Sequence, residues 1–262
     1  MRGRRHLFES DRAGIPKILH QTWKSGTLPA EFEHYRDSWL GHHPTWEHRF
    51  YDDAACHAFV GSCGQPWGDL YASLPTAIQR ADLFRYLVVH EKGGVYADID
   101  MVCYRPIDEL LEGGSCVLSV EAHLTGQRRR ELGFGTPRQL ANCIFAAKRG
   151  DPFLGVLLAH IADLEVLRFT VHADNDVEES TGPRMLTRLF EELDPVEGAR
   201  IRVLPQVLLM GPWEYPRIPF IGPRIYARHV AAGTWKRARG RNSLRRWWIE
   251  RNRLPDPWPR RP

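Results

Sequence analysis

Short apolar runs and amphipathic stretches alternate along most of the chain. Apolar runs of roughly four to eight residues, bounded by turn residues, are typical of buried strands. Longer stretches with apolar residues three and four positions apart are typical of helices packed against a sheet. The pattern predicts strands over 15–23, 46–51, 95–100, 115–122, 141–148 and 201–205, and helices over 29–40, 52–60, 75–92, 152–168 and 182–193.

The alternation of strands and helices favours an α/β fold, with a largely parallel central sheet flanked by helices. The 262 residues suffice for one large domain or two small ones. No internal repeat or low-complexity linker divides the chain. The simplest division is a polar leader at 1–14, one folded domain at 15–235 and a basic tail at 236–262.

The stretch 75–92 gives the clearest helix signal. Its apolar residues recur at helical spacing, and we expect Pro75 in the first turn, where its missing N–H costs nothing. Lys92 and the pair Gly93-Gly94 supply the stop signal. A strand of sequence VYADID, which turns polar at its carboxyl end, follows directly.

Composition places the chain among ordinary globular proteins. Hydrophobic residues make up 43% and charged residues 26%, which argues against a wholly disordered, fibrous or membrane-spanning chain. No apolar run reaches the roughly 18 residues of a transmembrane helix, and we expect no secretory signal after the basic start. The five cysteines form no CxxC pair, so we expect reduced thiols and a cytoplasmic protein.

Charge is distributed unevenly. The tail from Lys236 to Pro262 carries ten Lys and Arg against two acidic residues, a net charge of +8, and includes Trp247, Trp248 and Trp258. Cations interleaved with Trp suit an anionic membrane surface, which would place the protein peripherally at the inner face of the cell membrane. The alternative is a tail that is solvated or packed on the body. We expect no nucleic-acid partner.

The strongest chemical signal is the pair Asp98 and Asp100 at the end of the strand predicted over 95–100. If the strand continues through both residues, their side chains share a face. If a turn begins there, both carboxylates still lie at the carboxyl end of the strand, where open α/β sheets bind ligands. Two adjacent carboxylates repel, and a hard divalent cation resolves that conflict. Such a cation can stabilise a diphosphate leaving group.

The helix before this strand carries Asp82, Arg85 and Tyr86 on one face. An Asp–Arg pair on a helix is commonly an exposed local ion pair of little energy. Here the positions between and after these residues are apolar, so we expect much of the helix to be buried. A charged pair in such a helix needs a partner or a ligand.

Several segments, taken in order, resemble the family-32 glycosyltransferases, which have a DXD sugar-binding region. They are IPKILHQTW at 15–23, ADLFRY at 81–86, GGVYADID at 93–100, ANCIFAAKRGDPF at 141–153, TGP at 181–183 and YARHVAAGTW at 226–235. The family includes yeast initiating mannosyltransferases, lactosylceramide galactosyltransferases and bacterial capsule enzymes. The resemblance implies a GT-A fold and a nucleotide-diphosphate sugar donor, such as a UDP- or GDP-hexose. It also implies metal-dependent transfer that retains the anomeric configuration.

The resemblance assigns the nucleotide to the first strand and the loop after it. The residues at this position are His20, Gln21, Thr22 and Trp23. Trp23 would stack on the base, or else pack as a core aromatic at the end of the strand.

The resemblance assigns the sugar and the diphosphate to the helix and the DXD segment. Asp82 would accept from ribose or sugar hydroxyls, and Arg85 would bind hydroxyls or the diphosphate through its forked guanidinium, with Tyr86 beside them. Asp98 would touch ribose or sugar and share the metal. Asp100 would be the principal metal ligand.

The resemblance adds three further candidate site residues. Asn142 matches a position facing the transferred sugar, with an ordinary strand-edge amide as the alternative. His229 matches a histidine that completes the metal site, with a structural histidine as the alternative. Trp235 ends a glycine-containing loop that could close over the donor. The implied metal is Mn²⁺ or Mg²⁺.

The implied acceptor is a glycan or a lipid-linked hydroxyl compound. Retention by front-face attack needs no dedicated protein base, and the sequence identifies no nucleophile. Asp176, Glu178 and Glu179 are expected on a loop near the acceptor side, or as a merely solvated acidic loop. Two other functions use the same residues: a metal-dependent nucleotide-sugar hydrolase or pyrophosphatase, and a sugar-binding relative without turnover.

Overall fold

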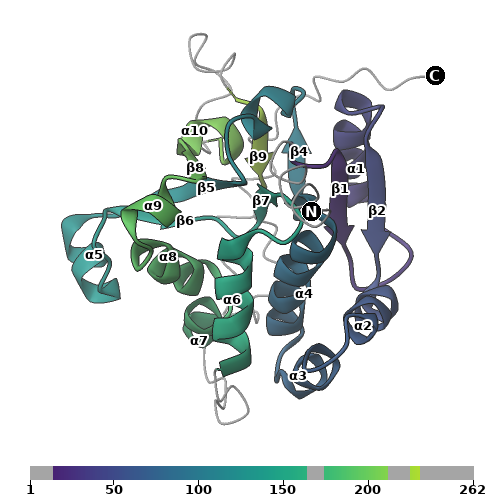
Figure 1. Ribbon diagram of the computed structural model, residues 1–262. Helices are drawn as coiled ribbons and strands as arrows, with labels where there is room; N and C mark the ends of the chain where they lie inside the picture. The colour runs from purple at the N-terminus through teal and green to yellow at the C-terminus, as the bar shows by residue number, and fades with distance from the viewer. Residues whose placement is uncertain (1–13, 164–173, 212–224, 231–262) are drawn as a thin grey trace, which may run out of the picture.

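The computed structural model describes residues 14–163, 174–211 and 225–230 (Figure 1). The predicted leader, apart from Gly14, and the predicted tail at 236–262 lie outside the described residues. Within the described ranges, helices flank a central sheet on both faces. The predicted α/β architecture is therefore confirmed.

The central sheet has seven strands in the order β2-β1-β3-β7-β5-β6, with β8 paired to β5. The strands are β1 (Ile18–Thr22), β2 (Glu47–Tyr51), β3 (Gly94–Ala97), β5 (Cys116–His123), β6 (Arg138–Leu140), β7 (Ile144–Ala147) and β8 (Ile201–Leu204). The pairs β1–β2, β1–β3 and β5–β8 are parallel, whereas β7 runs antiparallel to β3 and β5, and β6 antiparallel to β5. Strands β1, β3 and β5 therefore end at one edge of the sheet, where β7 begins.

One face of the sheet is covered by α4 (Ala77–Lys92) and α6 (Pro152–Asp163), which lie side by side in Figure 1. Every residue of α4 from Asp82 to Val89 is buried, as the apolar positions of this helix predict. The sheet contributes Tyr96 and Phe145 to the same core, and their rings stack with centroids 5.8 Å apart. Charged side chains on α4 are thus enclosed between the helix and the sheet.

The opposite face is covered by α1 (Ala30–His42), the 3₁₀ helix η1 (Asp108–Leu111), α10 (Gln206–Leu209) and a small second sheet. That sheet pairs β4 (Met101–Cys103) with β9 (Ala227–His229) in antiparallel fashion. The fully buried Trp39 of α1 donates its indole N–H to the Met101 carbonyl at 2.9 Å. This contact fixes β4 against α1.

The remaining helices are short and lie around the main layers (Figure 1). They are α2 (Asp53–Ser62), α3 (Trp67–Ser73), α5 (Gly126–Leu132), α7 (Asp174–Ser180), α8 (Pro183–Glu191) and α9 (Pro195–Gly198). The sequence pattern did not predict α3 or β6, because each is too short to show a hydrophobic period. All five cysteines are free, and four of them are buried.

Helix α4 begins later than predicted and ends at two glycines. Thr76 is its N-cap and accepts from the Gln79 N–H at 3.2 Å, so Pro75 precedes the helix and the prediction of Pro75 in its first turn is wrong. At the other end, a Cβ on Gly93 would lie 2.8 Å from Pro16 Cγ, and Gly93 has a φ of +68°. The glycines let β3 start directly against β1.

Candidate active site

The chain turns immediately after β3, and the turn holds both carboxylates of the DXD segment. The strand ends at Ala97, residues 99 and 100 form the turn, and β4 begins at Met101. The Asp98 N–H donates to the Cys143 carbonyl at 2.8 Å, while buried Ile99 packs in a small apolar cluster. Of the two geometries open from the sequence, the turn is the one observed.

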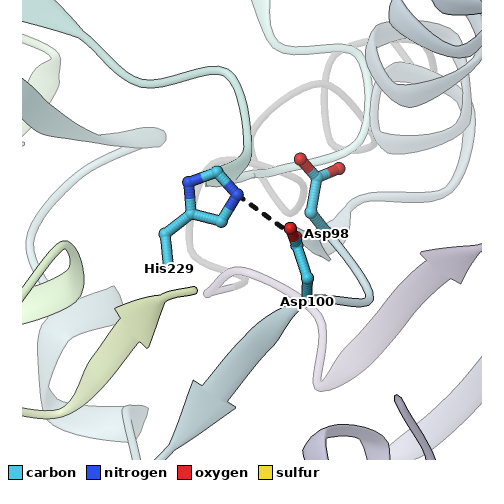
Figure 2. A group of neighbouring side chains, drawn as sticks. All are labelled: Asp98, Asp100 and His229. Carbon is cyan, nitrogen blue, oxygen red and sulfur yellow. Dashed lines mark hydrogen bonds and ion pairs between the residues drawn. The ribbon is translucent and has the colours of Figure 1, made fainter. Parts of the chain in front are cut away.

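Asp98, Asp100 and His229 form a group that we call the carboxylate cluster (Figure 2). One ligand atom from each residue can be chosen so that all lie within 4.8 Å of one another. His229 reaches the turn because β9 pairs with β4, with Met101 opposite His229, and its Nε2 lies 3.2 Å from Asp100 Oδ1. Two carboxylates and one imidazole suit Mn²⁺ or another divalent ion, so the residues fit the metal implied by the resemblance.

Asp98 is held by two neighbours that both contact its Oδ1 atom. The Tyr96 hydroxyl donates to this oxygen at 2.9 Å, and a guanidinium nitrogen of Arg85 lies 3.4 Å from it. Burial raises the pKa of Asp98, Arg85 opposes that rise, and Asp100 adds to it. Burial also opposes a charge on His229, but Cys143 and Asp100 outweigh it and raise the pKa of this imidazole.

Behind the carboxylate cluster, Asp82, Arg85, Asn142 and Thr181 form a second group, which we call the buried network. Arg85 donates to the Asn142 carbonyl at 2.9 Å, and its Nε lies 3.4 Å from Asp82 Oδ1. The guanidinium also lies over the Tyr96 ring, 4.9 Å from its centre. Arg85 is therefore shared between the two groups, since it contacts Asp82 on one side and Asp98 on the other.

Asp82 is satisfied by protein donors on both of its oxygens. Asn142 Nδ2 donates to Oδ1 at 2.9 Å, and the Thr181 hydroxyl donates to Oδ2 at 2.8 Å. Burial nevertheless raises the pKa of Asp82 to about 6, with Arg85 and Thr181 pulling it down. The Tyr86 hydroxyl donates to the Thr181 carbonyl at 3.1 Å. These bonds tie α4 to the entry of β7 and to the junction between α7 and α8.

Two of the four nucleotide candidates lie on the face of β1 that packs against α4. His20 is fully buried and donates from Nε2 to the Gly93 carbonyl at 2.9 Å, while its Nδ1 faces the Tyr51 hydroxyl at 3.4 Å. Burial lowers the pKa of His20 to about 4. Thr22 instead hydrogen-bonds the Tyr96 hydroxyl at 3.1 Å. Thr22 is thus connected to the carboxylate cluster, whereas His20 is enclosed by the protein.

Of the other two candidates, Gln21 lies on the opposite face of β1, and Trp23 directly follows the strand. Gln21 accepts from His48 Nε2 at 3.1 Å, and Trp23 packs against Phe32 with ring centres 4.7 Å apart. Gln21 Nε2 and Trp23 Nε1 are buried donors with no partner among the described residues. Two unsatisfied donors at the end of β1 are groups that a ligand could satisfy.

One sequence prediction near the site is wrong, and another lies outside the described residues. Residues 176–179 belong to helix α7, not to a loop, and Glu178 and Glu179 form ion pairs with Arg184 and Arg188 of α8 at 2.7 and 2.8 Å. The Glu178 and Glu179 carboxylates are thus compensated by the next helix. Trp235 lies outside the described residues.

Sequence reasoning also missed two residues that the structure brings to the site. Tyr96 contacts Asp98, and its position two residues earlier on the same strand face was a usable signal. Thr181 contacts Asp82 across 99 positions of sequence, and no local pattern marks such a contact.

Comparison with known proteins shows which proteins resemble this chain around the site. Residues 29–116 match the family described as "Glycosyltransferase sugar-binding region containing DXD motif". The matched range includes Asp82, Arg85, Asp98 and Asp100. Residues 29–116 are therefore similar to the DXD-containing sugar-binding region of this glycosyltransferase family, as the sequence resemblance predicts.

Curated relatives extend the similarity beyond that region. The chain is 31% identical over 186 residues to inositol phosphoceramide mannosyltransferase 3 of Schizosaccharomyces pombe, covering 70% of this chain and 47% of the relative. It is 28% identical over 208 residues to the initiation-specific alpha-1,6-mannosyltransferase of Candida albicans, covering 70% and 54%. The chain thus spans about half the length of these relatives.

Among solved structures, the PaToxG glycosyltransferase is similar at a TM-score of 0.47 and 15% identity, over 68% of this chain and 69% of that one.

In the part of the chain that the structure describes, no helix combines the length and the apolar character needed to cross a bilayer.

Proposed function

We propose that this protein is a metal-dependent glycosyltransferase that moves a hexosyl group from a nucleotide-diphosphate sugar to a hydroxyl acceptor, with retention of configuration. The observation that carries the proposal is the carboxylate cluster, which brings residues of the DXD turn to a histidine 129 positions away. The cluster lies at the edge where β1 and β3 end, which is where open α/β sheets bind ligands.

Asp98, Asp100 and His229 would hold a divalent ion, Mn²⁺ or Mg²⁺. When bound, the ion supplies positive charge that stabilises a diphosphate leaving group. The side chains of these three residues are 15–25% exposed, so a ligand can reach them. Two of the three potential ligands are carboxylates, the ligand type that hard divalent cations prefer.

Arg85 would support the donor from the inner side of the cluster. Its guanidinium is held by Asp82, the Asn142 carbonyl and Asp98, so its position is set before a ligand arrives. A preorganised cation beside a developing negative charge lowers the barrier without the cost of rearrangement. Gln21 Nε2 and Trp23 Nε1, the unsatisfied donors at the end of β1, are candidates for contacts to the nucleoside.

We propose a mannosyl donor, because both curated relatives described above are named mannosyltransferases. One of them is named for inositol phosphoceramide, which is a lipid. A lipid-linked or glycan hydroxyl is therefore the acceptor class that we propose for this chain.

The test is a donor panel of GDP-mannose, UDP-glucose and UDP-galactose, with Mn²⁺ or with EDTA, and with a glycan or a lipid acceptor. We expect GDP-mannose to be consumed only with Mn²⁺ and an acceptor, and to yield an α-linked product. Free mannose as the sole product with every acceptor would instead show a hydrolase. Donor binding without turnover would show a sugar-binding relative.

We further propose that the basic tail at 236–262 brings the enzyme to an anionic membrane surface. Each cation near such a surface contributes about 1 kcal/mol, which salt screens. Co-sedimentation with anionic vesicles should be strong for the full chain at low salt, weaker at high salt, and lost in a chain ending at residue 235. Equal sedimentation of both chains with anionic and neutral vesicles would contradict this proposal.

A further inference from the structure

The Asp98 carboxylate is oriented by a chain of hydroxyl groups that begins on a different strand. The Tyr96 hydroxyl donates to Asp98 Oδ1 at 2.9 Å, and Thr22 Oγ1 of β1 lies 3.1 Å from the same hydroxyl. Since the Tyr96 proton is committed to the carboxylate, the Thr22 hydroxyl must be the donor to Tyr96. The hydrogen bonds therefore run from Thr22 to Tyr96 to Asp98.

Tyr96 cannot act by touching a ligand. The residue is 0% exposed, and its ring is enclosed between Phe145 and the Arg85 guanidinium. What it can do is restrict rotation of the Asp98 carboxyl group, because a hydrogen bond to Oδ1 fixes the plane of both oxygens. The contacts of Tyr96 and Arg85 both fall on Oδ1, so Oδ2 is free of these two neighbours.

From this geometry we propose that Tyr96 is a positioning residue: its hydroxyl, held by Thr22, fixes Asp98 in the orientation that binds the divalent ion. The proposal rests on the proposed function, because it takes Asp98 as a metal ligand. Hydrogen-bond partners of metal ligands commonly contribute tenfold to hundredfold to metal affinity. The Thr22 contact further makes the end of β1 a part of the metal site, although no residue of β1 belongs to the carboxylate cluster.

The test is Tyr96→Phe in the full chain, which removes only the hydroxyl and keeps the ring against Phe145 and Arg85. Mn²⁺ binding is measured by titration calorimetry in the absence of donor, and thermal unfolding is followed in parallel. We expect the Mn²⁺ dissociation constant to rise by about tenfold or more. We also expect turnover to recover when Mn²⁺ is raised well above that constant, which the loss of a merely structural hydroxyl would not produce.

Two other variants complete the test. Tyr51→Phe is the matched control, because it removes a hydroxyl that bonds His20 on the same sheet face and does not contact Asp98; its Mn²⁺ affinity should equal that of the wild type. Thr22→Val removes the donor to Tyr96 and should weaken Mn²⁺ binding by a smaller factor, which keeps the test decisive if Tyr96→Phe fails to fold.

Wild-type Mn²⁺ affinity in folded Tyr96→Phe would overturn the inference and leave the proposed function intact. Where Tyr96→Phe does not fold, wild-type affinity in Thr22→Val overturns it in the same way. An absence of Mn²⁺ binding by the wild-type protein would instead overturn the proposed function, and the inference with it.

Discussion

Two groups of polar side chains lie at the same edge of the sheet, and they differ in how far the protein itself satisfies them. In the buried network, both oxygens of Asp82 accept hydrogen bonds from side chains, and the network residues are less than 10% exposed. In the carboxylate cluster, ligand atoms of Asp98, Asp100 and His229 lie within 4.8 Å of one another, and all three side chains are partly exposed. Polar groups that the protein satisfies and encloses support the fold, whereas carboxylates that solvent can reach can bind a cation.

The largest effect should come from the carboxylate cluster. Asp100→Asn keeps the shape of the side chain but removes the charge of the proposed principal ligand. We expect transfer to fall by about a thousandfold or more, because stabilisation of the leaving group is lost. The midpoint of thermal unfolding should not fall, since the substitution keeps the shape of a partly exposed side chain and removes its repulsion with Asp98. Full activity of this variant in EDTA-treated buffer would contradict the metal site.

A loss of stability, and not only of activity, should come from a change in the buried network. Asp82→Ala leaves the Arg85 guanidinium buried beside fewer negative groups and removes the acceptor of Asn142 and Thr181. Breaking one partner of a buried charged pair costs about 3 kcal/mol in the free energy of unfolding. Urea unfolding of the wild type and the variant measures this loss. A change well below 1 kcal/mol would show that Asp82 does not hold the fold together.

His20 should behave as a buried structural residue, although the resemblance places it among the nucleotide candidates. Its pKa is about 4 in the folded protein, below the ordinary value of 6.5, because the ring is buried. The unfolded chain therefore takes up a proton first as pH falls, and stability is lost between pH 6.5 and 4. At pH 5 this loss amounts to about 2 kcal/mol relative to pH 7.

Comparison with His20→Gln isolates that contribution, because the other histidines titrate in both proteins. The glutamine amide can still donate to the Gly93 carbonyl but carries no charge. The stability of this variant should fall less between pH 7 and pH 5, by about 2 kcal/mol. Parallel pH curves for the two proteins would show that His20 does not titrate in this range.

The smallest effect should fall on Arg85, the residue that the two groups share. Arg85→Lys keeps the charge but loses the fork that reaches Asp82, the Asn142 carbonyl and Asp98 together. We expect donor use to weaken by about tenfold, equivalent to about 1.4 kcal/mol. Steady-state kinetics with the donor varied provide the measurement. If the kinetics are unchanged and the stability is reduced, Arg85 serves only the buried network and does not contact the donor.

The elements that sequence predicted well are those with a strong hydrophobic period and clear end signals. Helix α4 and strand β3 follow from apolar spacing and the Gly93-Gly94 stop, and these two elements carry Asp82, Arg85 and the approach to Asp98. Helix α7 was missed because a short acidic segment has no apolar period, and its residues Glu178 and Glu179 pair with arginines of α8.

The site was harder to predict than the fold, because burial of polar groups depends on partners far away in sequence. His20 and Thr22 share a face of β1, yet one is enclosed under Gly93 and the other meets Tyr96. No local pattern separates them. His229 entered through the resemblance alone, since a three-residue strand such as β9 gives no signal of its own.

Because His229 lies on β9, the carboxylate cluster can form only after β9 has been synthesised and has paired with β4. The last strand of the central sheet, β8, ends at Leu204, whereas His229 emerges from the ribosome 25 residues later. At roughly 5–20 residues per second, the nascent chain can form its main sheet a second or more before the histidine is available. Until then Asp98 and Asp100 stand without their third partner. A partly synthesised chain would therefore hold its sheet while the carboxylate cluster, and with it the proposed metal site, is still incomplete.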